Sequence, residues 1–253
     1  MEVTRKDYFI QAAARNWEEA CRLAAQPLLE EGRMEADYVQ TLLQDNGRIG
    51  LSSGSTIRQM LGQLRPGTHR GLEIIQLKGM ANQEAALPDD CPGLCRHMAG
   101  LYPESEFKLL YSPLYVGHPT VRACLEAEPL IRQVLERYAD LDLAISSVSV
   151  FQQGEKSAWA SYISDEVYQH LYELGTRTCF LGHFIDGQGE IVSREVDEKQ
   201  VGISLDLLKS RRCTLILALG ARKAPAVLAT LRTGAVRYLC VDSSLAQAIL
   251  QLL

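Results

Sequence analysis

The sequence predicts an α/β fold in which a parallel β-sheet, mixed at its edge, is covered by helices. From about residue 46 onward, short runs of β-forming residues alternate with stretches of helical periodicity, as in β-α-β units. Several of these β-type runs are apolar almost throughout, which is typical of parallel strands buried on both faces. The length of 253 residues suits one large domain with a small addition rather than two full domains.

The elements follow from the local pattern of apolar and turn residues. Strands are expected over residues 47–51, 72–77, 107–111, 141–146, 178–184, 200–204, 214–219 and 237–241. Helices are expected over residues 56–64, 119–126, 129–138, 164–174, 223–232 and 243–252. The last helix is the clearest, because Leu245, Ala248, Ile249 and Leu252 share one face at helical spacing.

The first 43 residues are expected to form a helical appendage to a domain that covers residues 44–253. They contain no convincing strand. Asn16 followed by Glu19 has the pattern of a capping box, and Gly32 suits the end of that helical region. A further helix is expected over residues 35–43.

Charge and composition exclude several classes of protein. The formal net charge is −5, so there is no basic surplus and we expect no direct binding of DNA by this chain alone. No apolar run approaches the roughly 20 residues that cross a bilayer, and residues 1–7 lack the apolar region of a signal peptide. We therefore expect a cytoplasmic location and no membrane association.

The cysteines and histidines indicate neither a metal site nor a catalytic centre. The seven cysteines are spread along the chain among mostly apolar neighbours, which is typical of reduced, buried thiols. Cys91 and Cys95 lie near His97, but no second Cys or His pair follows at zinc spacing. No nucleophile, base and orienting group occur together. We expect no metal, no cofactor and no catalytic residue.

The segment after the first expected strand has the pattern of a phosphate-binding loop. Residues 50–58 read Gly-Leu-Ser-Ser-Gly-Ser-Thr-Ile-Arg, so a strand ends in small residues and a helix begins. Such a loop presents backbone N–H groups and the positive end of the helix dipole to an anion, and Ser53, Gly54, Ser55 and Thr56 are the candidates. The alternative is a plain turn of small residues in which Ser55 caps the helix.

A second strand-to-helix junction carries two cations. Arg222 and Lys223 fall in the first turn of the helix expected after Gly220, where cations oppose the helix dipole. Residues 206–253 hold seven Lys or Arg against two Asp or Glu. This local surplus fits either a bound anion or an ordinary charged surface.

Two carboxylates are candidates for contacts with sugar hydroxyls. Asp186 lies in the turn Asp-Gly-Gln-Gly, and Asp142 lies between a helix and a strand. Each of them can instead bond only to its own turn backbone. His183, inside an expected strand, is interpreted as a structural histidine.

Nine ordered segments resemble the effector-binding domain of SorC-type sugar-binding transcriptional regulators, over about residues 39–253. They are Gly50-Leu-Ser-Ser-Gly-Ser-Thr-Ile, Ile74-Ile-Gln-Leu-Lys-Gly, Leu110-Tyr-Ser-Pro-Leu-Tyr, Asp142-Leu-Ala-Ile, Leu181-Gly-His-Phe-Ile-Asp, Val201-Gly-Ile-Ser, Gly220-Ala-Arg-Lys-Ala-Pro-Ala-Val-Leu, Leu231-Arg-Thr-Gly and Leu239-Cys-Val-Asp.

The resemblance implies a Rossmann-like fold, related to ribose-phosphate isomerases and glucosamine-phosphate deaminases. It implies a sensor that binds a phosphorylated sugar and thereby controls the assembly of a regulator of sugar-metabolism genes, with a homo-oligomer as the expected state. The family's phosphate loop corresponds to Ser53–Thr56, its late basic residue to Lys223, its acidic turn to Asp186, and its glycine after the second strand to Gly79.

The chain departs from the family at two places. Ser146 and Ser147 stand where the family has a glycine-rich turn, and no helix-turn-helix is evident at the front. Residues 4–43 instead resemble, more weakly, a fragment of a phosphotransferase-system enzyme IIA domain without its phosphoacceptor histidine. Two alternatives follow: a sugar-phosphate isomerase or deaminase that uses Asp142 or Asp186, and an interaction component of a sugar phosphotransferase system.

Overall fold

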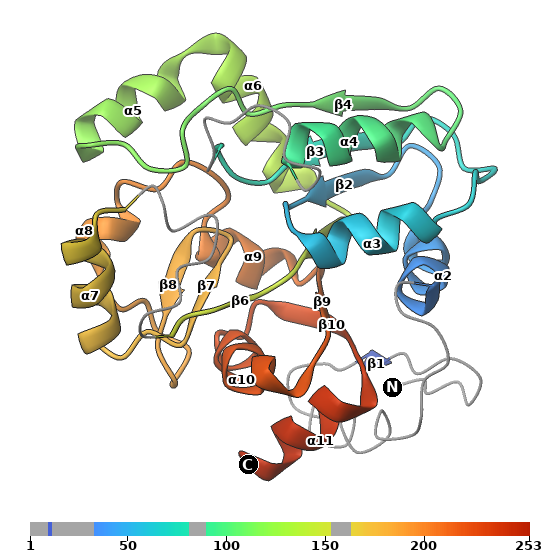
Figure 1. Ribbon diagram of the computed structural model, residues 1–253. Helices are drawn as coiled ribbons and strands as arrows, with labels where there is room; N and C mark the ends of the chain where they lie inside the picture. Colours follow the sequence, from blue (N-terminus) through green and yellow to red (C-terminus); the bar gives the residue numbers. More distant parts are fainter. Residues whose placement is uncertain (1–9, 12–32, 81–89, 153–162) are drawn as a thin grey trace.

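The computed structural model describes residues 10–11, 33–80, 90–152 and 163–253 (Figure 1). Within these residues, seven strands form one sheet in the order β1-β10-β9-β5-β2-β3-β4. Six of them run parallel, and β1 pairs antiparallel with β10 at one edge. The strands are β1 (Ile10–Gln11), β2 (Arg48–Leu51), β3 (Glu73–Gln76), β4 (Glu106–Lys108), β5 (Leu143–Ser146), β9 (Thr214–Ala218) and β10 (Val236–Val241).

A second, smaller sheet lies beside the main one. It is antiparallel and consists of β6 (Ser149–Val150), β7 (Thr178–Phe180) and β8 (His183–Ile185). Aromatic side chains form its own core, where the rings of Phe151 and Tyr168 stack with centroids 4.3 Å apart.

Helices connect the strands and cover both faces of the main sheet. They are α2 (Arg33–Leu42), α3 (Ser55–Gln63), α4 (Cys91–Gly100), α5 (Pro119–Ala127), α6 (Pro129–Arg137), α7 (Asp165–Glu173), α8 (Arg194–Asp197), α9 (Leu205–Arg211), α10 (Ala224–Arg232) and α11 (Ser243–Gln251), with short 3₁₀ turns η1 (Tyr138–Asp140) and η3 (Ala221–Lys223). No helix in the described part of the chain is long and apolar enough to span a bilayer.

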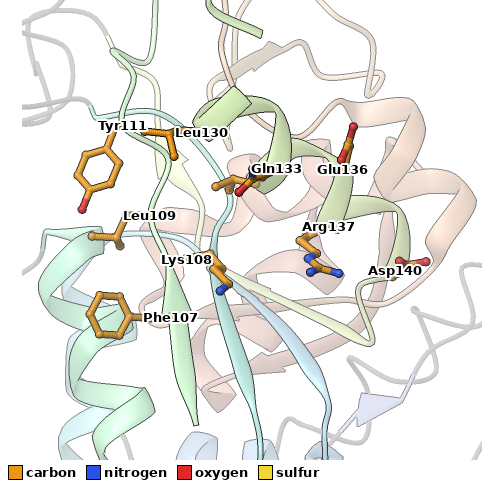
Figure 2. A pocket seen from close by; sticks show the side chains of 10 residues that line it. Phe107, Lys108, Leu109, Tyr111, Leu130, Gln133, Glu136, Arg137 and Asp140 are labelled. Carbon is orange, nitrogen blue, oxygen red and sulfur yellow. The ribbon is translucent and has the colours of Figure 1, made fainter. Parts of the chain in front are cut away.

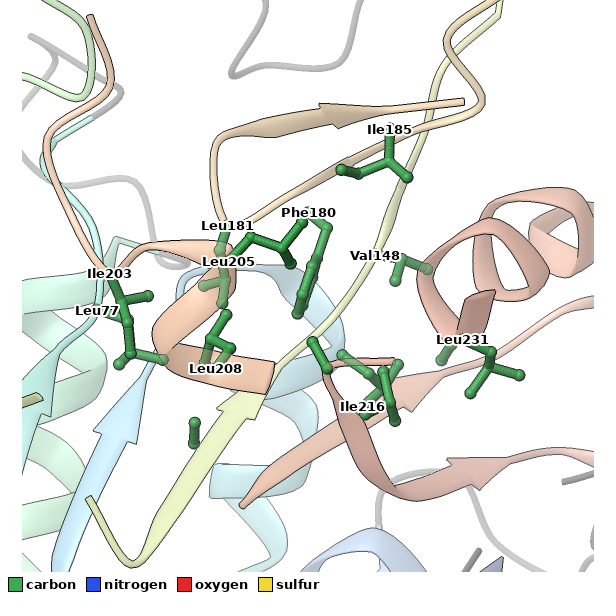
Figure 3. Packing of buried hydrophobic residues seen from close by; sticks show 14 of the residues in the cluster. Leu77, Val148, Phe180, Leu181, Ile185, Ile203, Leu205, Leu208, Ile216 and Leu231 are labelled. Carbon is green, nitrogen blue, oxygen red and sulfur yellow. The ribbon is translucent and has the colours of Figure 1, made fainter. Parts of the chain in front are cut away.

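Two hydrophobic cores lie on opposite faces of the sheet. Helices α2, α3 and α4 pack on one face with Leu143 and Ile145 of β5. Helices α6, α9, α10 and α11 pack on the other face with Ala144, as expected where successive residues of a strand point to opposite sides. Figure 3 shows this second core, in which Phe180 of the small sheet lies among leucine and isoleucine side chains. The Rossmann-like α/β fold is confirmed.

Most of the expected elements are present. The strands expected over residues 47–51, 72–77, 107–111, 141–146, 214–219 and 237–241 correspond to β2, β3, β4, β5, β9 and β10. The six helices expected after residue 46 correspond to α3, α5, α6, α7, α10 and α11. Helices α4, α8 and α9 were not expected from the sequence.

Two expected strands are corrected by the structure. Residues 178–184 form a hairpin, β7 and β8, because the chain turns at Leu181 and Gly182, both of which have positive φ. Residues 200–204 form no named strand and make only isolated bridges, through Gln200 to Tyr115 and through Gly202 to Lys78.

The N-terminal region contains one strand that was not expected. Ile10 and Gln11 pair with Leu239 and Tyr238 of β10, so this region adds a strand to the main sheet. The helix expected over residues 35–43 is confirmed as α2, whose Ala36 and Val39 are buried in the core that also holds β2. The helix expected after Asn16 lies outside the described residues. The boundary at residue 43 stays a prediction.

Candidate functional site

The strand order changes its direction of winding at β2. From β2 the chain moves to β3 and then to β4 on one side, and it returns on the other side of β2 to β5 and then to β9. In open α/β sheets, ligands bind outside the carboxyl ends of the strands where this direction of winding changes. The region between the carboxyl ends of β2 and β5, which we call the crevice, is therefore the expected binding position.

The loop after β2 opens toward this crevice. Ser52 continues the strand, because its N–H donates to the carbonyl of Ile145 at 3.0 Å. Gly54 is the N-cap of α3 with φ 139° and ψ 156°, and no side chain caps the helix. The alternative in which Ser55 caps α3 is therefore wrong, since Ser55 is already the first helical residue.

Gly54 approaches the end of β5 closely. A Cβ built on Gly54 would lie 3.0 Å from the side-chain oxygen of Ser147, and a φ of 139° is one that L-residues with a side chain rarely adopt. The close approach brings the Ser147 hydroxyl, a hydrogen-bond donor and acceptor, beside the N-terminus of α3.

Lys223 reaches the same loop from the other side of β5. Its Nζ donates to the side-chain oxygen of Thr56 at 3.5 Å, although 167 positions separate the two residues. Burial lowers the pKa of Lys223 from its ordinary value; the Asp242 carboxylate opposes this shift, and Arg222 adds to it. The ammonium group is thus partly desolvated, and a bound anion would stabilise its charged form.

Asp242 positions the turn that carries Lys223. One of its carboxylate oxygens accepts a hydrogen bond from the N–H of Gly220, and the other accepts from Leu245 N–H at 2.8 Å as the cap of α11. Burial works to raise the pKa of Asp242, but hydrogen bonds from Ser244, Leu245 and Gly220 outweigh burial and lower the pKa. Asp242 was not among the candidate site residues, although the Asp-Ser-Ser sequence after β10 has the pattern of a helix cap.

The described helices fall into two groups by how they begin. Side chains cap α4, α5, α7, α8, α9 and α11. Side-chain caps are absent from α3, α6, α10, η1 and η3, and of these α3 and η3 begin after the carboxyl ends of β2 and β9. Unsatisfied N–H groups and the positive end of the helix dipole favour an anion there.

The structure does not bring Asp142 to this site. Asp142 precedes β5, so it lies at the amino end of the strand, opposite to Ser147. Its carboxylate accepts a hydrogen bond from the N–H of Arg48 at 2.8 Å, at the start of β2. This contact supports the start of two neighbouring strands rather than a ligand.

Asp186 also lies away from the crevice. Its carboxylate accepts from the N–H groups of Gln188 and Glu190 at 2.8 and 3.0 Å, which closes its own turn. Arg232, at the C-terminal end of α10, donates a hydrogen bond to the carbonyl of Gly187 in this turn. The crevice lies at the other end of α10. The two ends of this nine-residue helix are about 12 Å apart, at 1.5 Å per residue.

Gly79 lies at the same edge of the sheet as the crevice, just after β3, and packs against backbone. Its N–H donates to the carbonyl of Val201 at 2.9 Å, and a Cβ there would overlap the backbone of Pro113. The observed reason for glycine at this position is therefore close packing of two chain segments.

The buried His183 and the neighbouring thiols of Cys91 and Cys95 have their partners within the fold. His183 is buried, with Nδ1 2.5 Å from a carboxylate oxygen of Asp197 and Nε2 2.9 Å from the carbonyl of Ile203. The thiols of Cys91 and Cys95 are buried and 3.9 Å apart. Among the described residues, no three His, Cys, Asp or Glu side chains gather in a way that could hold a metal ion.

Comparison with known proteins identifies the family of the chain. A family model described as "Putative sugar-binding domain" matches residues 23–251. The deoxyribonucleoside regulator of Bacillus subtilis (strain 168) is 22% identical over 228 residues, which cover 86% of this chain and 68% of that protein. This chain spans about two thirds of the length of its curated relatives.

Solved structures share the fold. A transcriptional regulator from Streptococcus pneumoniae TIGR4 has a TM-score of 0.82 at 20% identity, over 87% of this chain and 84% of that chain. The full-length sorbitol operon regulator SorC from Klebsiella pneumoniae has a TM-score of 0.78 at 19% identity, over 87% of this chain and 70% of that chain. Because the family model covers nearly the whole sequence, the chain belongs to the family of putative sugar-binding domains.

Proposed function

We propose that this domain binds a phosphorylated sugar in the crevice between β2 and β5, and that binding changes the assembly of a transcriptional regulator. The observation that carries the proposal is the approach of Lys223 to Thr56 at the uncapped start of α3. Backbone N–H groups, hydroxyls and one partly desolvated cation gather there, which suits a phosphate group.

The phosphate contacts in this proposal come from Ser53, Gly54, Ser55 and Thr56, with Lys223 supplying charge. Ser147 is added as a contact of the sugar ring or phosphate, because its hydroxyl lies beside Gly54. Asp142 and Asp186 are left out, because both bond to backbone elsewhere.

The proposed role is binding without catalysis, in the cytoplasm. An isomerase or deaminase needs a carboxylate or imidazole within reach of the carbon whose proton it moves. The two carboxylates considered for this role, Asp142 and Asp186, lie at the other end of β5 and at the far end of α10. The enzyme alternative therefore gains no support from the crevice.

A thermal-shift and calorimetric panel tests the proposal. Phosphorylated pentoses, hexoses and sugar alcohols are each compared with their unphosphorylated forms, since the relatives' names mention deoxyribonucleosides and sorbitol. At about 100 times Kd a ligand adds about 2.7 kcal/mol to stability, which for a chain of this size raises Tm by roughly 5–10 °C. The absence of any shift with every phosphorylated sugar at millimolar concentration would contradict the proposal.

A further inference from the structure

Three exposed apolar side chains lie close together on β4, on the segment after it and on α6. Seven large hydrophobic residues are exposed among those the structure describes, and three of them, Phe107, Tyr111 and Leu130, line one groove between β4 and α6. Figure 2 shows this groove, with β4 on one side and α6 on the other. Its volume is about 620 Å³. Tyr111 and Leu130 are 75% and 74% exposed, so the groove presents apolar surface to a partner.

The backbone of the same strand is available for pairing. β4 is the last strand of the sheet, and no strand in the described residues pairs with its outer edge. The N–H of Glu106 donates to the carbonyl of Leu72, so Glu106 and Lys108 direct their backbone groups toward β3. Because these groups alternate along a strand, the N–H and C=O of Phe107 point outward.

The charge pattern of β4 complements itself. In an antiparallel pair of two β4 strands centred on Phe107, the two Phe107 residues exchange both backbone hydrogen bonds. Glu106 of each copy then lies opposite Lys108 of the other copy, which gives two pairs of opposite charge. Both are non-hydrogen-bonded pairs of the antiparallel ladder, in which the facing side chains are closest. Shifting the pairing by two residues would place Glu106 opposite Glu106, or Lys108 opposite Lys108. Only the register centred on Phe107 pairs opposite charges.

The remaining charges of the groove also fit a partner that is a second copy. Lys108 and Arg137 balance Glu136 and Asp140, so the groove has no excess of either sign. Arg137 is already paired with Glu73 at 3.3 Å, and Asp140 with Arg48 at 3.5 Å. A strongly charged partner such as nucleic acid finds no complementary field there.

We infer that two copies of this chain associate through β4, as antiparallel neighbours centred on Phe107 across a two-fold axis, with the groove beside α6 covered by the second copy. The arrangement is isologous, since each strand gives and receives the same contacts. It joins the two main sheets into one continuous sheet and removes the open edge of each. This inference is independent of sugar binding.

The experiment uses charge reversal, because Glu106 is exposed and Lys108 is half-buried, and neither belongs to a hydrophobic core. E106K gives one chain two lysines on β4, and K108E gives another chain two glutamates. Each variant alone places like charges opposite each other, and their 1:1 mixture restores two opposite-charge pairs. The exposed Glu190, in a turn of the small sheet, supplies the matched control E190K.

Analytical ultracentrifugation measures the dimer dissociation constant of each sample. We expect the 253-residue chain to be dimeric, E106K and K108E each to dimerise roughly tenfold to hundredfold more weakly, and the mixture and E190K to match the original chain. A chain that stays monomeric at about 200 µM protein would overturn the inference. So would single variants with unchanged dimerisation, or a mixture that fails to recover it.

Discussion

Replacing Lys223 with methionine tests whether the partly buried cation serves a ligand or the fold. Methionine keeps the length and apolar body of lysine but removes the charge, so the surrounding packing is retained. The structure gives this ammonium one hydrogen bond, at 3.5 Å to Thr56, and burial lowers its pKa. The fold therefore gains little from the charge, and K223M should be at least as stable as the original chain.

Binding of a phosphorylated sugar should behave in the opposite way. A hydrogen bond between a charged donor and a phosphate contributes about 1.5–3 kcal/mol, so K223M should weaken binding by about 10- to 150-fold. Isothermal titration calorimetry measures the affinity, and differential scanning calorimetry measures Tm. Unchanged affinity for the phosphorylated sugar, or a fall in Tm by many degrees with weaker binding, would refute the role given to Lys223.

The pKa of Lys223 adds a second test of the same residue. In the unfolded chain this lysine keeps its proton up to about pH 10.5, whereas in the folded chain it releases it at lower pH. Between those two values the unfolded state binds more protons, so the stability of the unliganded protein rises with pH in this window. Affinity for a phosphorylated sugar should fall over the same window. K223R stays protonated there and should keep its affinity constant.

Three further expectations concern the neighbours of Lys223. G54A should lower stability by about 1–3 kcal/mol, because alanine resists a φ of 139° and its Cβ meets Ser147; a chemical denaturation midpoint equal to that of the original chain would contradict this. D186N should leave the affinity for a phosphorylated sugar unchanged in calorimetry, and a loss of tenfold or more would return Asp186 to the site. D242N should lose less stability in acid than the original chain, as measured by urea unfolding below pH 5. The pKa of Asp242 is lowered in the folded chain, so the carboxylate stabilises the fold at higher pH and this contribution disappears as the pH falls through that lowered pKa.

The position of the candidate site was accessible from the sequence because it depends on strand direction. An apolar run followed by small residues and a helix places those residues at the carboxyl edge of a parallel sheet, whichever strands are neighbours. Ser53–Thr56 and Lys223 both satisfy this rule, and the structure brings Thr56 and Lys223 together. Ser147 follows β5 and satisfies the rule too, but its type differs from the glycine expected by resemblance.

The two carboxylates lie away from the proposed site for different physical reasons. The strand expected over residues 141–146 included Asp142, whereas β5 begins at Leu143. Asp142 therefore precedes the strand and lies at the edge of the sheet opposite the site. Asp186 follows a strand, but that strand is β8, which belongs to the small antiparallel sheet. Nothing in the local pattern distinguishes β8 from a strand of the main sheet.

The small sheet shows why local pattern stops short of the whole fold. Its strands are two or three residues long, below the length at which alternation or an apolar run can be recognised. The turn at Leu181 and Gly182 is held from outside the hairpin: Tyr115 donates its hydroxyl to the carbonyl of Gly182, and the side-chain amide of Gln200 donates to the carbonyl of Leu181. Leucine at a positive φ is unfavourable by itself, so these distant contacts, and not the residues of the turn, determine where the chain reverses. The same contacts occupy residues 200–204 and explain why that apolar segment does not join the main sheet as a strand.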